Sequence, residues 1–372
     1  MRLVVLGICG ATLVCAMSSA SAADSSVTLY GVTDVFVQYL DNGAKHSYSE
    51  KSGGSTGSRF GLAGAEDLGD SLKVKFDVET GFNINNGLLF GDTGALFYRQ
   101  AWVGLSHEQF GSLTFGRQYE PSFRVVYPSD PFGLNELLSP ISANVLAVDR
   151  NTLSIQNETG RASNSILYQS PSLRGLQFYG MYAFSATVTQ PTPATTGNML
   201  NVGASYSGFG FYAGFAYVNQ HAGQATIPGL PGQLNLLGTE HFIGALAYRI
   251  GIVNLQANYS FQRADDAPGR SLAALLRTAH SYSTAQLGAT IQATPADAIE
   301  VAIFERNVRG EHDNAPGIQV GVDHSLSKRT SFYARAGYIK NNGSATTSWP
   351  GVTVSEHGTK QILAVMGMTH RF

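Results

Sequence analysis

The chain has 372 residues, with 24 Lys and Arg against 26 Asp and Glu, and its mean hydropathy is close to zero. This slight acidic excess gives no overall electrostatic support for binding nucleic acid, so we expect no nucleic-acid partner. Both cysteines, Cys9 and Cys15, lie near the N-terminus, which leaves the rest of the chain without a disulfide framework or a thiol site. Beyond them no stretch offers about 18 uncharged, uniformly apolar residues, which excludes a helical membrane protein.

The N-terminal segment has the three parts of a secretory signal. A short positive start and an apolar run over residues 3–17 precede a region of small residues, 18–23, which contains Ala-Ser-Ala. The apolar run is too short for a transmembrane anchor, and no stop-transfer pattern follows it. We therefore predict a signal peptide over residues 1–23 that is cleaved on export, and a single domain over residues 24–372.

The segment that begins at residue 72 alternates without exception. Its apolar residues are Leu72, Val74, Phe76 and Val78, and its charged residues are Lys73, Lys75, Asp77 and Glu79. A period of two predicts a strand with one apolar and one charged face, which fits both a soluble half-buried strand and the wall of a membrane barrel. On the lipid side of a barrel a Lys costs about 2 to 4 kcal/mol, so four charges would cost on the order of 10 kcal/mol. In a barrel, the charged face must therefore lie toward a wet interior.

About sixteen alternating or aromatic-rich segments follow one another along the chain. They cover residues 27–40, 58–66, 72–81, 98–106, 112–117, 164–170, 176–184, 199–206, 211–219, 241–248, 253–263, 281–290, 298–308, 317–326, 331–340 and 361–372. Their connections alternate between short ones, such as 67–71 and 207–210, and long polar or Gly- and Pro-rich ones, such as 41–57 and 220–240. A soluble sandwich or propeller has no reason to separate loop lengths in this way, whereas outer-membrane barrels do. The sequence predicts an all-β fold, a 16-stranded antiparallel transmembrane β-barrel around an aqueous channel.

One connection, from Gln118 to Ser163, does not alternate. It carries four prolines and mixes acids with apolar residues in no regular period. Connections longer than about 12 to 15 residues without structure of their own are usually functional or disordered. The sequence alone leaves both interpretations open.

In these features the sequence resembles the general porins of Gram-negative bacteria, most closely the beta-proteobacterial type. The residues that carry the resemblance are Ser26-Val-Thr-Leu-Tyr-Gly-Val32, Ser58-Arg-Phe-Gly-Leu62, Glu66-Asp-Leu-Gly69, Arg99-Gln-Ala-Trp-Val-Gly-Leu105, Leu113-Thr-Phe-Gly-Arg-Gln118 and His370-Arg-Phe372. The resemblance implies a homotrimer in the outer membrane, surrounded by lipid and lipopolysaccharide, whose second long loop, residues 82–97, holds a neighbouring subunit. It also implies that Phe372 belongs to a signal that the outer-membrane assembly machinery recognises.

The resemblance further implies a constriction of the channel. The third long loop, residues 118–163, would fold into the lumen, where its acids would face a ladder of basic residues on the opposite wall. The candidates for the basic wall are Arg59, Lys75, Arg99, Arg117 and Arg161, and those for the loop acids are Glu120, Asp130 and Glu136, with Asp149 and Glu158 as further ones. Rows of opposite charge create a transverse field that filters solutes by charge and dipole. Any single loop acid could instead be a solvated charge without a role.

The expected function is passive diffusion of small hydrophilic solutes and ions, with a weak charge selectivity that leans toward anions. Ala63 stands where many such porins carry a Lys, which lowers the positive charge of the wall. The alternative is a surface receptor or adhesin barrel with a closed lumen. An enzyme is not expected, because the nine histidines lack metal-ligand spacing and no Gly-x-Ser-x-Gly elbow is present, so we predict no catalytic residue, cofactor or metal site. The aromatic residues expected in girdles at the membrane interfaces are Trp102, Tyr168, Phe178, Tyr182 and Tyr248.

Overall fold

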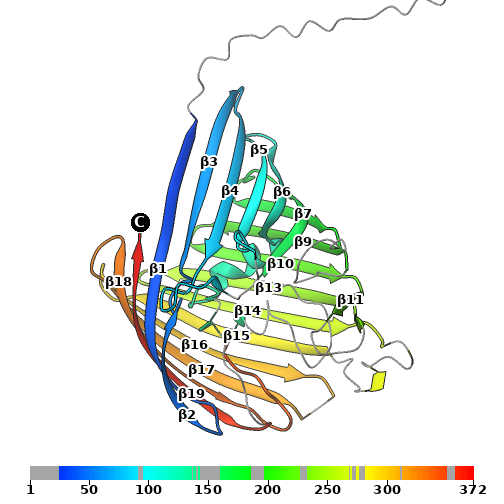
Figure 1. Ribbon diagram of the computed structural model, residues 1–372. Helices are drawn as coiled ribbons and strands as arrows, with labels where there is room; N and C mark the ends of the chain where they lie inside the picture. Colours follow the sequence, from blue (N-terminus) through cyan, green and yellow to red (C-terminus); the bar gives the residue numbers. More distant parts are fainter. Residues whose placement is uncertain are drawn as a thin grey trace, which may run out of the picture.

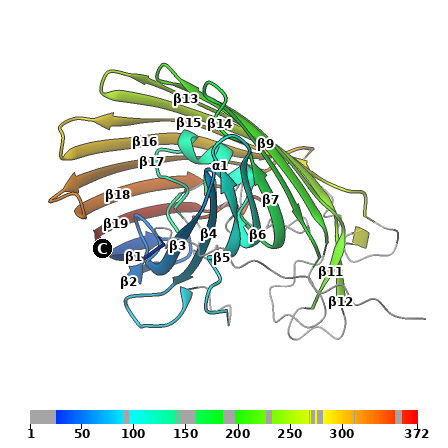
Figure 2. The same cartoon turned by 90° about the horizontal axis from the view of Figure 1, so that it is seen from above.

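The strands of the molecule form a closed antiparallel β-barrel (Figures 1 and 2). The computed structural model describes residues 25–90, 95–135, 137–139, 141–142, 160–185, 197–226, 233–267, 269, 274–275, 281–310, 312–349 and 357–372. The barrel closes where β1 (Ser26–Asp41) pairs with β19 (Lys360–Arg371), in a register that places Val35 opposite Met368.

The other strands follow chain order around the ring. They are β2 (His46–Ser52), β3 (Arg59–Gly69), β4 (Leu72–Gly81), β5 (Gln100–His107), β6 (Gly111–Tyr119), β7 (Arg161–Gln169), β8 (Leu176–Ala183), β9 (Met199–Gly208), β10 (Phe211–Gln220), β13 (Thr239–Ile250), β14 (Val253–Ala264), β15 (Ser281–Gln292), β16 (Asp297–Val308), β17 (Asn314–Ser325) and β18 (Thr330–Lys340). A small separate hairpin, β11 (Gly223–Thr226) with β12 (Gln233–Leu236), lies in the connection between β10 and β13. A short helix, α1 (Pro121–Val126), and a 3-10 turn, η2 (Tyr127–Ser129), follow β6.

Strands β2 and β3 share one place in the ring. Residues 26–32 of β1 pair with β3, and residues 35–41 pair with β2. The barrel therefore has sixteen strand positions, as the sequence predicts, and each predicted strand is present. The prediction of a continuous loop over residues 41–57 is wrong, because β2 lies within it. Without β2, the second half of β1 would leave its backbone groups on that side unpaired in the barrel wall.

The two faces of the wall differ in chemistry. On β5 the side chains of Val103 and Leu105 are about half exposed, and these residues pair with Phe76 and Val74 of β4. Glu79 lies on the opposite face of β4 and is only 4% exposed. The apolar face of β4 is therefore the outer surface, and its charged face points to the interior, as predicted.

Trp102 does not belong to an outer aromatic girdle. It pairs with Asp77 on the inner face, and its Nε1 donates a hydrogen bond to Gln100 Oε1 at 3.2 Å. Side chains alternate between the two faces of a strand, so Trp102 points inward because Val103 points outward. The other four aromatic residues of the prediction are exposed: Tyr168, Phe178, Tyr182 and Tyr248.

The last strand ends against the first one. Phe372 and Gly31 exchange two backbone hydrogen bonds, of 3.0 and 3.1 Å. The Phe372 ring covers Gly31 so closely that a Cβ there would lie 2.2 Å from Cζ and 2.8 Å from the Arg59 carbonyl oxygen, so a side chain at this position would displace the ring. Ile362, Met366 and Met368 are exposed on the outer surface, as the alternation of the C-terminal segment predicts.

Among the described residues, none of the helices has the length and apolar character needed to span a membrane.

Candidate functional site

The connection after β6 packs against side chains of the barrel wall. Pro121 occupies the start of α1, where its fixed φ and missing N–H suit a first helical turn. Tyr212 of β10 donates to the Val125 carbonyl at 2.7 Å, and Gln256 of β14 donates to the Pro128 carbonyl at 3.0 Å. These donors come from strands distant from β6, so the connection crosses to another part of the ring. Figure 2 shows α1 within the curve of the strands.

An apolar cluster joins the same connection to the wall. Its wall members include Phe36, Ile243, Phe304 and Leu363, which are all less than 5% exposed. The members from the connection are Val125, Val126, Leu134, Leu138 and Ile141. Burial of such side chains contributes about 1.5 to 3 kcal/mol each, enough to fix the connection against the wall.

The carboxylate of Asp130 is held by several hydrogen bonds. It accepts hydrogen bonds from the backbone N–H groups of Phe132 and Leu134 at 3.2 and 2.8 Å. It also accepts from Ser139 Oγ at 2.6 Å and from Gln286 Nε2 of β15 at 3.1 Å. Because Asp130 is 3% exposed, its carboxylate shapes the turn and ties it to the wall instead of offering an open charge.

Glu120 is also turned toward the wall. Asn201 Nδ2 of β9 donates to Glu120 Oε2 at 2.9 Å, and Ser122 Oγ donates to the same oxygen at 3.2 Å. The residue is 3% exposed. The other acids predicted in the loop, Glu136, Asp149 and Glu158, lie outside the described residues.

Three of the predicted basic residues meet on the inner wall. Glu79 stands between Arg59 and Arg99, with N···O distances of 3.1 Å to Arg59 Nε and 2.7 Å to Arg99 Nε. Arg99 Nη2 donates to the Tyr119 hydroxyl at 3.1 Å. Arg161 donates to the same hydroxyl, and its guanidinium lies 4.3 Å from the centroid of the Tyr119 ring. Arg59, Arg99 and Arg161 thus form one network, with the Glu79 carboxylate between the first two and the Tyr119 hydroxyl between the last two.

The other two predicted basic residues lie apart from that network. Arg117 donates from Nε to the Tyr98 carbonyl and from Nη1 to Ser163 Oγ at 2.9 Å, at an irregularity of the sheet next to Gly116. Lys75 is exposed and precedes Glu79 by four residues on β4, about 13 Å along a strand.

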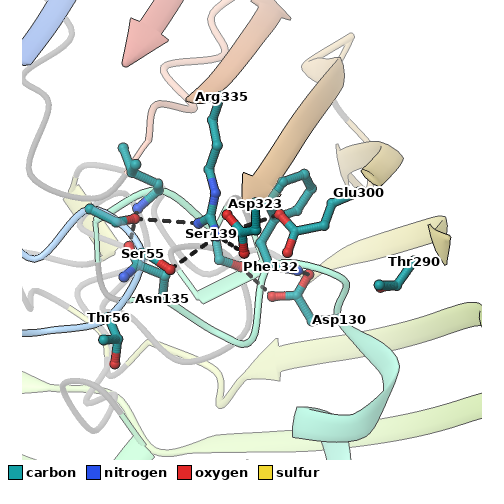
Figure 3. Close-up of polar contacts among 12 residues, drawn as sticks. Ser55, Thr56, Asp130, Phe132, Asn135, Ser139, Thr290, Glu300, Asp323 and Arg335 are labelled. Carbon is teal, nitrogen blue, oxygen red and sulfur yellow. Dashed lines mark hydrogen bonds and ion pairs between the residues drawn. The ribbon is translucent and has the colours of Figure 1, made fainter. Parts of the chain in front are cut away.

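A second charged cluster, on β16 to β18, is absent from the sequence-based prediction (Figure 3). Arg335 Nη2 lies 3.4 Å from Glu300 Oε2 and 3.9 Å from Asp323 Oδ2. The Arg335 guanidinium also lies 5.3 Å from the centroid of the Phe132 ring, next to Asp130 in the connection. The sequence contained a signal for this cluster, because Glu300, Asp323 and Arg335 all lie at inward positions of strands whose side chains alternate between the two faces. The family resemblance did not point to them.

The turn between β2 and β3, residues 53–58, is the other unpredicted part of the site. Asp34 of β1 is fully buried and accepts hydrogen bonds from the backbone N–H groups of residues 54, 55 and 56 at 2.7, 3.0 and 3.1 Å. The hydroxyls of Tyr333 and Thr369 donate to the same carboxylate at 2.7 and 2.6 Å. Asn135 Nδ2 reaches the Gly53 carbonyl at 3.0 Å, so this turn also touches the connection after β6.

This turn positions arginines of both charged clusters. Arg59 Nη1 donates to Thr56 Oγ1 at 3.1 Å and to the Gly57 carbonyl at 3.2 Å. Arg335 donates to the Gly54 carbonyl at 3.3 Å and to Ser55 Oγ at 3.4 Å. The described part of the chain holds no group of three or more His, Cys, Asp or Glu side chains arranged to bind a metal ion.

The sequence of this chain is similar to those of known outer membrane porins. The profile of a family described as Gram-negative porin matches residues 10–344. The chain is 29% identical to an outer membrane porin protein of Bordetella pertussis, with 89% of this chain and 93% of the relative covered. It is 27% identical to outer membrane porin protein 32 of Delftia acidovorans, with 97% and 98% covered.

Solved structures share the same fold. The anion-selective porin from Comamonas acidovorans superposes with a TM-score of 0.78 at 24% identity, over 94% of this chain and all of that one. The trimer form of OmpT from Vibrio cholerae gives a TM-score of 0.67 at 14% identity, over 94% of this chain and 99% of that one.

Proposed function

Since this chain belongs to the Gram-negative porin family, we propose that it forms a passive channel for small hydrophilic solutes and ions across the outer membrane. The observation that carries the proposal is the difference in chemistry between the outer and the inner surface of the barrel wall. The outer surface is apolar at positions such as Val103 and Leu105, while the inner one holds the Arg59–Glu79–Arg99 network. Such a charged network would be far more costly against lipid than on the wall of a wet lumen, which supports a hydrated path through the interior.

We further propose that the connection after β6 narrows this path. Its helix α1 and the turn at Asp130 are tied to β9, β10, β14 and β15 by hydrogen bonds from inward side chains. On the wall near β3 to β7, five basic residues accompany three acids; the basic residues are Arg59, Lys73, Lys75, Arg99 and Arg161, and the acids are Asp67, Asp77 and Glu79. On β16 to β18, two basic residues, Arg306 and Arg335, accompany the two acids Glu300 and Asp323. This uneven distribution supports a transverse field and a weak preference for anions.

The test is electrical. Purified protein reconstituted in planar bilayers should give stepwise conductance, and in a salt gradient the reversal potential should indicate a weak anion preference. Arg99→Ala should shift that potential toward cations, because it removes one positive charge and leaves Glu79 with Arg59 alone. A shift toward anions, or none, would contradict the proposed role of the wall.

Folded protein that gave no conductance would instead favour the second candidate, a receptor or adhesin barrel with a closed lumen. Liposome swelling separates the two functions, since a closed barrel would not admit small sugars. The packing of the connection after β6 against buried side chains of the wall supports this candidate, because a segment that filled the lumen more completely would close the path.

We propose a homotrimer as the assembled form, with residues 82–97 as the contact to a neighbouring subunit. The solved trimer form of Vibrio cholerae OmpT, which has the same fold, supports this proposal. Conductance steps that occur in threes are the expected result, and independent single steps would argue for a monomer.

Residues 1–23 are proposed as the cleaved export signal, and N-terminal sequencing of the protein from outer membranes would detect a mature start near residue 24.

Phe372 is proposed as part of the assembly signal. Its ring is 46% exposed at the end of β19, where an outside factor could reach it. We expect Phe372→Ser to lower the amount of heat-stable protein in isolated outer membranes severalfold. Refolding of the same variant from urea into detergent micelles should change less, because the backbone hydrogen bonds between Phe372 and Gly31 remain and the lost ring is already about half exposed. An equal loss in both measurements would make Phe372 a stabilising residue and not a signal.

A further inference from the structure

Trp102 lies on the inner face of the wall, and the site described above does not use it. It pairs with Asp77 of β4 on one side and with Gly116 of β6 on the other, where no side chain is present to cover the indole. The side chain of Trp102 is partly exposed. Among the described residues, the apolar cluster that holds the connection after β6 does not include it. Core packing therefore does not explain why a large aromatic ring borders the lumen.

A chain of hydrogen bonds fixes the indole in place. Trp102 Nε1 donates to Gln100 Oε1 at 3.2 Å, and Gln100 Nε2 donates to Asp77 Oδ2 at 3.3 Å. The Tyr30 hydroxyl of β1 donates to Asp77 Oδ1 at 2.8 Å. Because the indole N–H is used within this chain, the faces of the ring are left for contacts with a solute. Side chains that are already held in place lose less freedom when a ligand binds.

The polar groups beside the ring are of different kinds. The Asp77 carboxylate can accept more hydrogen bonds than the two it receives, and Lys75, exposed on the same face of β4, carries three N–H donors. Lys75 is a diagonal neighbour of Trp102, within reach of a long side chain. Ala63 of β3 lies directly opposite Asp77, so that position carries no charge. Trp102 follows Arg99 by three residues, about 10 Å along the strand, which separates this group from the arginine network.

We propose that Trp102 forms a subsite for uncharged sugars, in which a sugar ring stacks on the indole and its hydroxyls bind Asp77, Gln100 and Lys75. The C–H groups of a sugar ring carry a slight positive charge and pack against the negative face of an aromatic ring. A hydroxyl both donates and accepts, which matches a carboxylate, an amide and an ammonium group placed together. The ammonium group of Lys75 also disfavours cationic solutes at this ring.

The proposal rests on the proposed channel function, because the sugar must enter the lumen to reach Trp102. It deepens that function by naming a class of solute that charge selectivity does not distinguish, and it assigns the recognition to a part of the wall away from the arginine network.

The first experiment measures block of the ion current by a sugar. Channels in planar bilayers are bathed in KCl, with D-glucose added in one series and D-sorbitol in another. Sorbitol has the same carbon chain without a ring, so it raises viscosity but cannot stack, and we expect a saturating block by glucose alone. In Trp102→Ala the half-blocking concentration of glucose should rise at least about fivefold. Tyr248→Ala removes an aromatic ring from the outer surface and should leave the block unchanged.

Fluorescence tests the subsite without any current. The chain has two tryptophans, Trp102 and the fully buried Trp349, so Trp349→Phe leaves Trp102 as the one emitter. In detergent, glucose should change this emission with the same half-saturation as the block, and sorbitol should not. The KCl current without sugar tests the channel function separately. Protein that responds to glucose in fluorescence but conducts no ions would contradict the channel and not the subsite.

Three outcomes would overturn the proposal. They are equal glucose block in the unchanged protein and in Trp102→Ala, equal effects of glucose and sorbitol on the current, and a Trp102 emission that does not respond to glucose. If Trp102→Ala yields no channels, Trp102→Leu decides, because leucine keeps an apolar side chain without an aromatic face. Block of Trp102→Leu at the unchanged glucose concentration would contradict the assignment.

Discussion

Glu79→Gln should make the channel clearly more selective for anions. Glu79 is 4% exposed and pairs with both Arg59 and Arg99, so its neutralisation adds a full positive charge to the inner wall. A unit charge in water acts on an ion about 6 Å away with roughly 0.7 kcal/mol, which corresponds to about a threefold change in local anion concentration. The reversal potential in a KCl gradient measures this change. It should move in the direction opposite to that of Arg99→Ala.

The same substitution should weaken the barrel. Removal of one partner of a buried ion pair typically costs about 3 to 5 kcal/mol, because the other charge stays buried without compensation. Urea unfolding in lipid vesicles, followed by tryptophan fluorescence, would report this loss. Glu108→Gln is the matched control, because it removes an acid from an exposed turn. If both variants showed the same selectivity, Glu79 would not determine the field in the lumen.

Asp34→Asn should release the turn over residues 53–58. The carboxylate of Asp34 accepts from three backbone N–H groups and two hydroxyls, and an amide offers only one acceptor oxygen in their place. Hydrogen bonds to a charged group contribute about 1.5 to 3 kcal/mol each, so the loss of two would cost at least about 3 kcal/mol. Because this turn holds both Arg59 and Arg335, we expect frequent brief changes of conductance and greater current noise.

A chemical measurement complements the electrical one. Both cysteines of the chain lie in the N-terminal segment, so a cysteine introduced by Ser55→Cys reports on this turn after export. A water-soluble maleimide should label it at least severalfold faster when Asp34→Asn is also present. Asp266→Asn changes an exposed carboxylate and serves as the control. Equal labelling rates and equal noise in the two backgrounds would show that the turn stays in place without Asp34.

The position of the strands and the direction of their faces could be predicted residue by residue. The alternation at residues 72–80 already separates the outward Val74 and Phe76 from the inward Asp77 and Glu79. Trp102 shows where such reasoning fails even locally. Its residue type suggested the membrane interface, but the phase of its strand turns it inward toward Asp77. The phase of the alternation predicts whether a side chain points to the lumen or to the outer surface better than its aromatic character does.

The candidate site was less accessible to prediction. Arg59, Arg99 and Arg161 were expected on the inner wall, and they meet there around Glu79 and Tyr119. Asp130 was expected to place a charge in the constriction, yet its carboxylate accepts hydrogen bonds from backbone N–H groups of its own turn and from Gln286. A sequence shows that a carboxylate is present, but its availability depends on which donors surround it.

The sequence by itself determined the barrel, its number of strands and which side chains face the lumen, because a period of two is a local property that each strand carries alone. Only the tertiary structure decided which of the inward charges meet. Asp34 reaches Tyr333 across the closure of the barrel, and Arg335 reaches the turn at Gly54, although about 280 to 300 residues separate each pair along the chain. Such contacts depend on the height of each residue along the barrel axis, which the register of all the strands sets together. The charge balance of the channel is therefore a property of the closed ring and not of any one segment.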